Sequence, residues 1–161
     1  MQKEPMLKAT FNRLSKELEH LKTVERVAIA KVIDTARELG DLKENAEYHS
    51  AKEKQGLMEA RIIELTDLIS RAHIINPSTL THKRVSFGST VELIDQDDDN
   101  EVSYTIVGSQ ESNPEIGYIS ISSPMGRALL GKEEGDEVEI NLPSGKKVFD
   151  IENIYCMKEI D

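Results

Sequence analysis

The chain has 161 residues, of which 20 are basic and 30 are acidic, so its formal net charge is −10 at neutral pH. Only 38% of the residues are hydrophobic and 4% are aromatic, which favours one or two small modules over one large core. No apolar run approaches the roughly 20 residues that a membrane-spanning helix needs, and no apolar stretch follows Met1 as in a signal peptide. The single cysteine, Cys156, excludes an internal disulfide and a multi-cysteine metal site. A soluble, cytoplasmic protein is expected.

The negative charge is confined to the second half of the chain. Residues 1–76 contain 13 basic and 13 acidic side chains, whereas residues 77–161 contain 7 basic and 17 acidic side chains. An acidic surface repels phosphate backbones, so the second half is a poor binder of nucleic acid by itself. The asymmetry predicts two modules with different partners.

The first half of the chain begins with a long helical pattern. No Gly or Pro occurs between Lys8 and Leu39, which predicts an uninterrupted helix over this stretch. Apolar residues recur along it at helical spacing, first strictly and then less strictly, at Phe11, Leu14, Leu18, Leu21, Val24, Ala28, Val32 and Ala36.

A second helical pattern follows after a short connection, residues 40–45. It is a heptad seam with one polar position, formed by Tyr48, Ala51, Gln55, Met58, Ile62, Leu65, Ile69 and Ala72. Pro77 is expected to close this helix. Because the connection is short, the two helices are predicted to run antiparallel as a coiled-coil hairpin, which would reach roughly 45 Å from the rest of the molecule.

The second half changes to the period of two that is typical of strands. After a linker at Asn76–Thr79, strands are predicted over residues 90–95, 102–107, 117–121, 138–142 and 147–154. One short helix interrupts them, with Ser123 as N-cap, Pro124 at its first position and Gly131 just beyond its end. The predicted fold class is α+β, with a two-helix hairpin over residues 1–76 and a small, mostly antiparallel sheet with one helix over residues 77–161.

The tip of the predicted hairpin, near residues 40–47, is rich in carboxylates. In one interpretation, Asp41 and Glu44 form a capping box for the second helix and Gly40 is the C′ residue of the first. In the other, the carboxylates at the end of a thin arm are inserted into a partner. Hard oxygen ligands of this kind suit Mg²⁺, but a partner would have to complete the ligand set.

Basic residues and histidines occur near the tip and elsewhere without a decisive pattern. The basic side chains of Arg37, Lys43, Lys52 and Lys54 are either solvated flanks of the coiled coil or a small patch for a nucleic-acid backbone. The histidines lack metal-ligand spacing and are expected at the surface or beside the seam; they are His20, His49, His73 and His82.

Two stretches resemble one protein family. Residues 36–49 read ARELGDLKENAEYH and closely resemble the tip signature of the bacterial Gre transcript-cleavage factors, of the GreA type. Residues 122–132 read SSPMGRALLGK and, with the Gly-Asp-Glu-Val at residues 135–138, resemble the C-terminal FKBP-like domain of the same family. The resemblance covers essentially the whole chain. The charge-neutral hairpin favours the A type over the B type, in which a long basic stripe follows the hairpin.

The resemblance implies an accessory factor of bacterial RNA polymerase rather than an enzyme. The C-terminal domain, through Ser122, Ser123 and Pro124, would dock at the rim of the secondary channel, and the hairpin would enter the channel. Asp41 and Glu44 would then help the polymerase to hold its second Mg²⁺ and to orient a water, which accelerates cleavage of the nascent RNA near its 3′ end in backtracked complexes.

Further site residues and partners follow from the same resemblance. Arg37 and Lys52 match the small basic patch that contacts the extruded RNA. The resemblance implies no Mg²⁺ on the isolated protein, no small-molecule substrate and no membrane partner.

Three alternatives remain open at this stage. A coiled-coil folding helper with a peptidyl-prolyl isomerase domain would need an aromatic-lined pocket, and the second half contains few aromatic residues and no Trp. An inhibitory Gre homologue would keep the architecture, but the intact pair of Asp41 and Glu44 argues against that role. A purely structural coiled-coil adaptor leaves the acidic tip unexplained.

Overall fold

The computed structural model describes residues 2–158, which divide into two compact units. The first unit comprises Gln2 and residues 11–72, and the second comprises residues 3–10 and 73–158. The contacts therefore place the border after Ala72, whereas the sequence pattern placed it after Asn76. None of the helices in the described part of the chain combines the length and the apolar character needed to span a bilayer.

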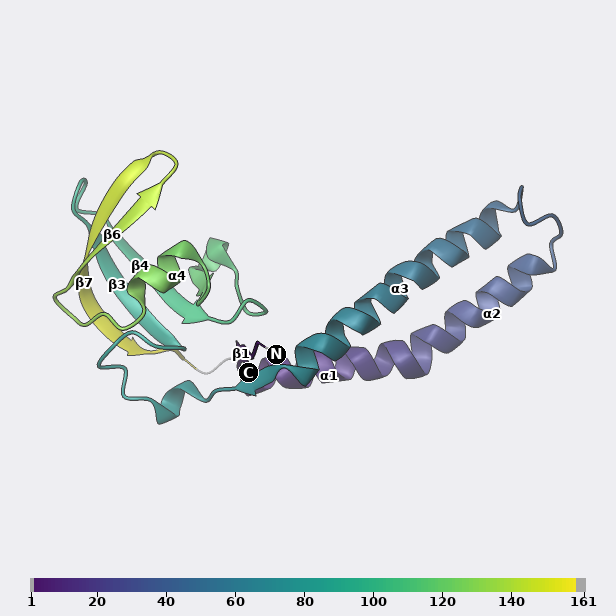
Figure 1. Ribbon diagram of the computed structural model, residues 1–161, viewed down its shortest axis with the longest axis horizontal. Coiled ribbons are helices and arrows are strands. Elements are labelled where there is room, and N and C mark those ends of the chain that lie inside the picture. Colours follow the sequence, from purple (N-terminus) through teal and green to yellow (C-terminus); the bar gives the residue numbers. More distant parts are fainter. Residues whose placement is uncertain (1, 159–161) are drawn as a thin grey trace. The chain divides into compact units, whose positions relative to one another are not determined.

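The first unit is a helical hairpin (Figure 1). Its first arm consists of α1 (Lys8–His20), a π-helical turn η1 (Leu21–Glu25) and α2 (Arg26–Arg37), and its second arm is α3 (Ala46–Ser70). The two predicted helices are confirmed. However, α3 ends at Ser70 and not at Pro77, because the residues that follow it form strand β2 (Ala72–Ile74).

The π-helical turn changes which residues of the first arm are buried. Val24 and Val32, predicted members of the seam, are 50% and 52% exposed, whereas Ile33 and Ala36 are only 6% and 2% exposed. A π-helical turn contains one residue more than an α-helical turn, so the residues after it are shifted by one position around the helix. The predicted seam positions Val24, Ala28 and Val32 are therefore wrong, whereas the predicted Ala36 is confirmed. The seam of α3 is confirmed at Ala51, Ile62 and Leu65, which are buried. Near the end of the helix the buried residue is Leu68 and not the predicted Ile69, and Ala72 lies in β2.

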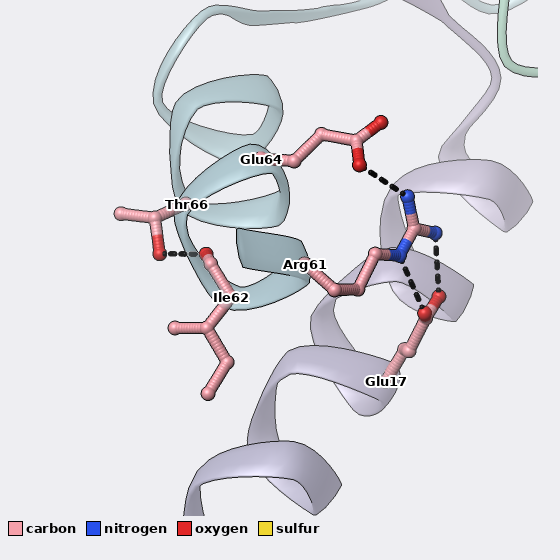
Figure 2. Close-up of polar contacts among 5 residues, drawn as sticks. All are labelled: Glu17, Arg61, Ile62, Glu64 and Thr66. Atoms are coloured by element: carbon pink, nitrogen blue, oxygen red, sulfur yellow. Dashed lines mark hydrogen bonds and ion pairs between the residues drawn. The ribbon is translucent and has the colours of Figure 1, made fainter. Parts of the chain in front are cut away.

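Two ion pairs connect the arms of the hairpin on either side of the π-helical turn. Before the turn, Arg61 bonds Glu17 through Nε at 2.8 Å and a second guanidinium nitrogen at 3.0 Å (Figure 2). After the turn, Arg26 bonds both carboxylate oxygens of Glu59 at 2.8 Å. Bidentate ion pairs of this kind have a defined geometry, so they favour one register of the two arms.

The second unit is built on a five-stranded sheet in the order β5-β4-β3-β7-β6. Its strands are β3 (Ser89–Asp95), β4 (Glu101–Val107), β5 (Tyr118–Ser120), β6 (Glu137–Leu142) and β7 (Gly145–Cys156). All pairs are antiparallel except β4 with β5. The five predicted strands are confirmed. Strand β1 (Glu4–Met6), which pairs with β2, and the short 3-10 helices η2 (Pro77–Thr79) and η3 (Pro114–Ile116) were not predicted.

One helix, α4 (Pro124–Leu129), packs against the core of this unit through the buried Leu129. The core is formed by apolar residues of every strand of the sheet, among them Val91, Leu93, Ile106, Ile119, Val138, Ile140, Phe149 and Ile151. The alternation of apolar residues along each strand therefore indicated the buried face correctly.

His82 does not lie at the surface as predicted. It is 7% exposed, and its ring nitrogens lie 2.6 Å from Ser89 Oγ and 2.7 Å from the carbonyl oxygen of Pro77. Both ring nitrogens therefore have hydrogen-bond partners, as buried polar groups generally do. The bonds connect His82 to η2 on one side and to the start of β3 on the other.

Candidate functional site: the acidic tip of the hairpin

Asn45 determines where the second arm begins. It is the N-cap of α3, and its Oδ1 accepts a hydrogen bond of 3.0 Å from the backbone N–H of Tyr48. Asp41 instead accepts a bond of 2.9 Å from the N–H of Lys43, within the tip loop. The predicted capping box of Asp41 and Glu44 is therefore wrong. Asn is as good an N-cap as Asp, and the side chain of Asp41 serves a local Asx-turn.

The end of the first arm also differs from the prediction. The C-cap of α2 is Glu38, so Gly40 lies one residue beyond the C′ position. Its φ of +110° is one that L side chains rarely adopt, which explains a glycine at this point of the loop.

The two carboxylates proposed as catalytic lie exposed in the tip loop, residues 38–45. Neither Asp41 nor Glu44 forms an ion pair with another residue between 2 and 158. Because Asn45 caps α3, neither carboxylate is needed to end a helix. Their charges remain available to a cation outside the chain.

The donor set fits Mg²⁺ only in part. Mg²⁺ takes one or two protein carboxylates and keeps several waters or takes ligands from a partner. Within residues 2–158, no group of three or more His, Cys, Asp or Glu side chains is arranged to hold a metal ion. Asp41 and Glu44 could therefore contribute to a shared metal site, but they do not form a complete one.

Two of the predicted basic residues, Arg37 and Lys52, lie on different arms near the tip. The guanidinium carbon of Arg37, in the last turn of α2, lies 5.8 Å from the ring centroid of Tyr48 on α3, a cation–π distance. Lys52 follows Tyr48 by four residues, hence on the same side of α3, and its Nζ bonds Gln55 at 2.8 Å. Both basic side chains are exposed. The sequence pattern did not single out Tyr48 as the ring that Arg37 contacts.

The three residues predicted to dock differ in what their side chains do. Ser123 is the N-cap of α4, and its hydroxyl accepts a bond from Gly126 N–H at 3.0 Å and donates one to the Ser120 carbonyl at 2.6 Å. Ser122 and Pro124 are exposed. A Cβ on Gly126 would lie 2.2 Å from the carbonyl oxygen of Ser120, so this glycine allows the close approach of α4 to β5. Of the three residues, Ser122 and Pro124 are thus the exposed ones, and the Ser122 hydroxyl lies 2.9 Å from Ser120 Oγ.

Asn45 and His49 also shape the tip, although the sequence pattern assigned neither of them a role there. His49 Nε2 lies 3.2 Å from the carbonyl oxygen of Lys43, and the His49 ring packs edge-on against Tyr48 at 5.6 Å between centroids. The available signal was Asn45 itself, because Asn directly before an uninterrupted helical pattern is a strong N-cap candidate.

Comparisons with known proteins give the same kind of factor for both halves of the chain. A family model described as "Transcription elongation factor, N-terminal" matches residues 4–74, and one described as "Transcription elongation factor, GreA/GreB, C-term" matches residues 80–155. "Transcription elongation factor GreA" of Sulfurovum sp. (strain NBC37-1) is 73% identical over 154 residues, which are 96% of this chain and 95% of that protein.

Two further matches are more distant. The protein of the same name from Nautilia profundicola is 59% identical and covers 99% of this chain and 98% of its own. The crystal structure of GreA factor homolog 1 (Gfh1) of Thermus thermophilus is 31% identical, covers 96% of this chain and 99% of its own, and has a TM-score of 0.44. Since both family models match and the named relatives align nearly end to end, the chain belongs to the GreA/GreB family of transcription elongation factors, and within it to the GreA type.

Proposed function

We propose that this protein binds bacterial RNA polymerase and, without being an enzyme itself, stimulates the polymerase to cleave nascent RNA in backtracked complexes. The observation that carries the proposal is the pair of exposed carboxylates, Asp41 and Glu44, in a loop at the end of a two-helix arm. The 25 residues of α3 span roughly 38 Å at 1.5 Å per residue. An arm of that length and only two helices thick can enter a channel that leads to a buried active site.

The charge of the two carboxylates is the chemical contribution of this chain. With part of the ligand set supplied by the polymerase, Asp41 and Glu44 would hold the second Mg²⁺ there and accept a hydrogen bond from the attacking water. Mg²⁺ bound at such a shared site would stabilise the attacking and leaving oxygens of the phosphodiester. Two carboxylates leave most of the coordination sphere of the ion to water, so the isolated protein is not expected to cleave RNA.

Two other surfaces complete the proposal. Arg37 and Lys52, which are both exposed, would contact the phosphates of the extruded RNA 3′ end. Ser122 and Pro124, exposed at the start of α4, would contribute to docking on the polymerase, with Ser123 shaping the turn as its N-cap. The acidic second half repels nucleic acid, which agrees with a protein surface as its partner.

The experiment is transcript cleavage in purified, stalled elongation complexes with the double variant Asp41→Asn, Glu44→Gln. Both substitutions remove the negative charge of the side chain and keep nearly the same side-chain shape. Because Asn45, and not Asp41, caps α3, the helix content and thermal midpoint should stay as in the unchanged protein. Stimulated cleavage should fall by about ten- to a hundredfold, as expected for removing charge beside a catalytic ion.

The matched control is Glu53→Gln, which removes one exposed carboxylate from α3 outside the tip and should leave cleavage unchanged. The unchanged protein, the double variant and Glu53→Gln should compete equally well for polymerase. Full cleavage by the double variant would contradict the proposed role of the tip.

A further inference from the structure

The side chain of Asn45 bonds both arms of the hairpin at the tip. Its Oδ1 accepts the N–H of Tyr48 on α3 at 3.0 Å, and its Nδ2 donates to the carbonyl oxygen of Ala36 on α2 at 2.5 Å. Ala36 is 2% exposed, so the second bond is made to a carbonyl of the hairpin seam. One amide group thus bonds a free N–H at the start of one helix and a carbonyl near the end of the other, which also accepts the N–H of Leu39 at 3.1 Å.

A second pair of bonds holds the loop between these two ends. Both backbone polar groups of Lys43 have partners. Its N–H donates to Asp41 Oδ1 at 2.9 Å, and its carbonyl oxygen lies 3.2 Å from His49 Nε2. His49 lies on the first turns of α3, four residues after Asn45. The backbone that carries Asp41 and Glu44 is therefore connected to α3 through His49 and to both arms through Asn45.

We infer that Asn45 is a positioning residue for Asp41 and Glu44: its amide holds the two helix ends together and so sets where the two carboxylates are presented. The inference rests on the proposed function, since it assigns a role in the same reaction. Asn45 does not touch substrate or metal in this account. It acts through the backbone of residues 41–44, and a misplacement of about 1 Å in a catalytic group can cost up to a hundredfold in rate.

The chemistry of the side chain explains why Asn in particular is needed. Ser and Asp accept a hydrogen bond at an N-cap about as well as Asn does. Neither can also donate from the same position to the Ala36 carbonyl, because ionised Asp has no donor and the Ser hydroxyl is shorter. Substitution by Ser or Asp therefore removes the bond between the arms and keeps the cap.

The test measures stimulated RNA cleavage with Asn45→Ser and Asn45→Asp in stalled elongation complexes, over a range of factor and Mg²⁺ concentrations. Both variants should lower the maximal rate by about tenfold and raise the Mg²⁺ concentration needed for half-maximal rate. The factor concentration for half-maximal rate, the helix content and the thermal midpoint should not change. Asn45→Asp is informative because it adds a carboxylate to the tip and is still expected to be impaired.

The matched control is Asn76→Ser, which makes the same substitution at the N-cap of η2 in the second unit and should behave like the unchanged protein. Unchanged maximal rate and Mg²⁺ dependence in both Asn45 variants would overturn the inference. So would a loss of rate that accompanies a lower thermal midpoint with unchanged Mg²⁺ dependence, because that result assigns Asn45 to folding alone. The double variant Asp41→Asn, Glu44→Gln is run alongside: if it cleaves normally the proposed function fails, whereas if it is inactive and Asn45→Ser is active only the inference fails.

Discussion

Arg61 ties the two arms of the hairpin together, because its guanidinium bonds Glu17 on α1 and also lies 3.2 Å from Glu64 on its own helix (Figure 2). The hydrogen bond from Arg61 lowers the pKa of Glu17 below its ordinary value of 4.5. The same bond to Glu17 raises the pKa of Arg61. A lowered pKa means that the folded hairpin binds fewer protons than the unfolded chain, so the contribution of Glu17 is present above pH 4.5 and is lost on acidification.

Glu17→Gln should lower the thermal midpoint at pH 7, with a loss of no more than about 1 kcal/mol because the pair is one-third exposed. The difference between the variant and the unchanged protein should shrink as the pH falls below 4.5 and Glu17 becomes protonated. Circular dichroism melts at pH 7 and at a series of lower pH values measure this. Glu19→Gln, at an exposed position nearby, is the control. A difference that persists undiminished at the lower pH would show that the charge of Glu17 is not the cause.

Among the elements, the π-helical turn has the clearest structural consequence. The first arm is helical from Lys8 to Arg37 without Gly or Pro, yet the residues buried after Leu21–Glu25 are shifted by one position relative to the pattern before it. One ion pair between the arms, Glu17 with Arg61, lies before the turn, and the other, Arg26 with Glu59, lies after it. The turn therefore lets two differently phased apolar patterns face the same partner helix, α3.

Deleting one residue from the π-helical turn should be tolerated, and deleting one from α2 should not. Removal of the exposed Val24 converts the turn to α-helix and leaves both flanking segments in phase with α3. Removal of the exposed Lys31 rotates Ile33 and Ala36 out of the seam, and exposure of an isoleucine alone costs about 1.5–3 kcal/mol. Thermal unfolding of the two deletion variants compares them directly. A Val24 deletion that destabilises as much as the Lys31 deletion would show that the turn is required for the register.

At the scale of the whole molecule, the two halves of the chain differ in charge and in proposed task. Residues 1–76, which include the acidic tip, have no net charge, whereas residues 77–161 carry the entire net charge of −10. The second unit also includes residues 3–10, which reach it through β1. Leu7 N–H donates to Glu111 Oε1 at 2.7 Å and so attaches this segment to the unit. The N-terminal residues are thus part of the sheet domain, although they precede the hairpin in the chain.

Pro124→Ala should weaken competition for polymerase several-fold and leave thermal unfolding nearly unchanged. Pro124 is exposed at the first position of α4, where Ala is also a good helix residue, and the Ser123 cap stays in place. Displacement of a labelled competitor from purified polymerase measures the effect, and Pro143→Ala, at an exposed position between β6 and β7, is the control. Equal displacement by both variants would remove Pro124 from the docking surface.

Local patterns in the sequence determined most of the elements. The β-branched alternation of each strand, the Ser123 cap with Pro124 after it, and the left-handed Gly131 at φ +80° depend on interactions within a few residues. They could therefore be predicted from the sequence without knowledge of the fold. The acidic residues of the tip could be predicted for the same reason, since their place in a short connection between two helical patterns is a local property.

Only the tertiary structure decided which residues meet across the chain. The buried position of Ile33 follows a π-helical turn that the apolar pattern of the first arm did not indicate, and the pairing of β1 with β2 joins segments that are far apart in the sequence. Asn45 could be recognised as a cap from its neighbours, but its bond to Ala36 exists only because the second arm folds back beside the first. Helix phase and cross-arm hydrogen bonds depend on the partner surface, and the periodicity of one segment carries no information about that surface.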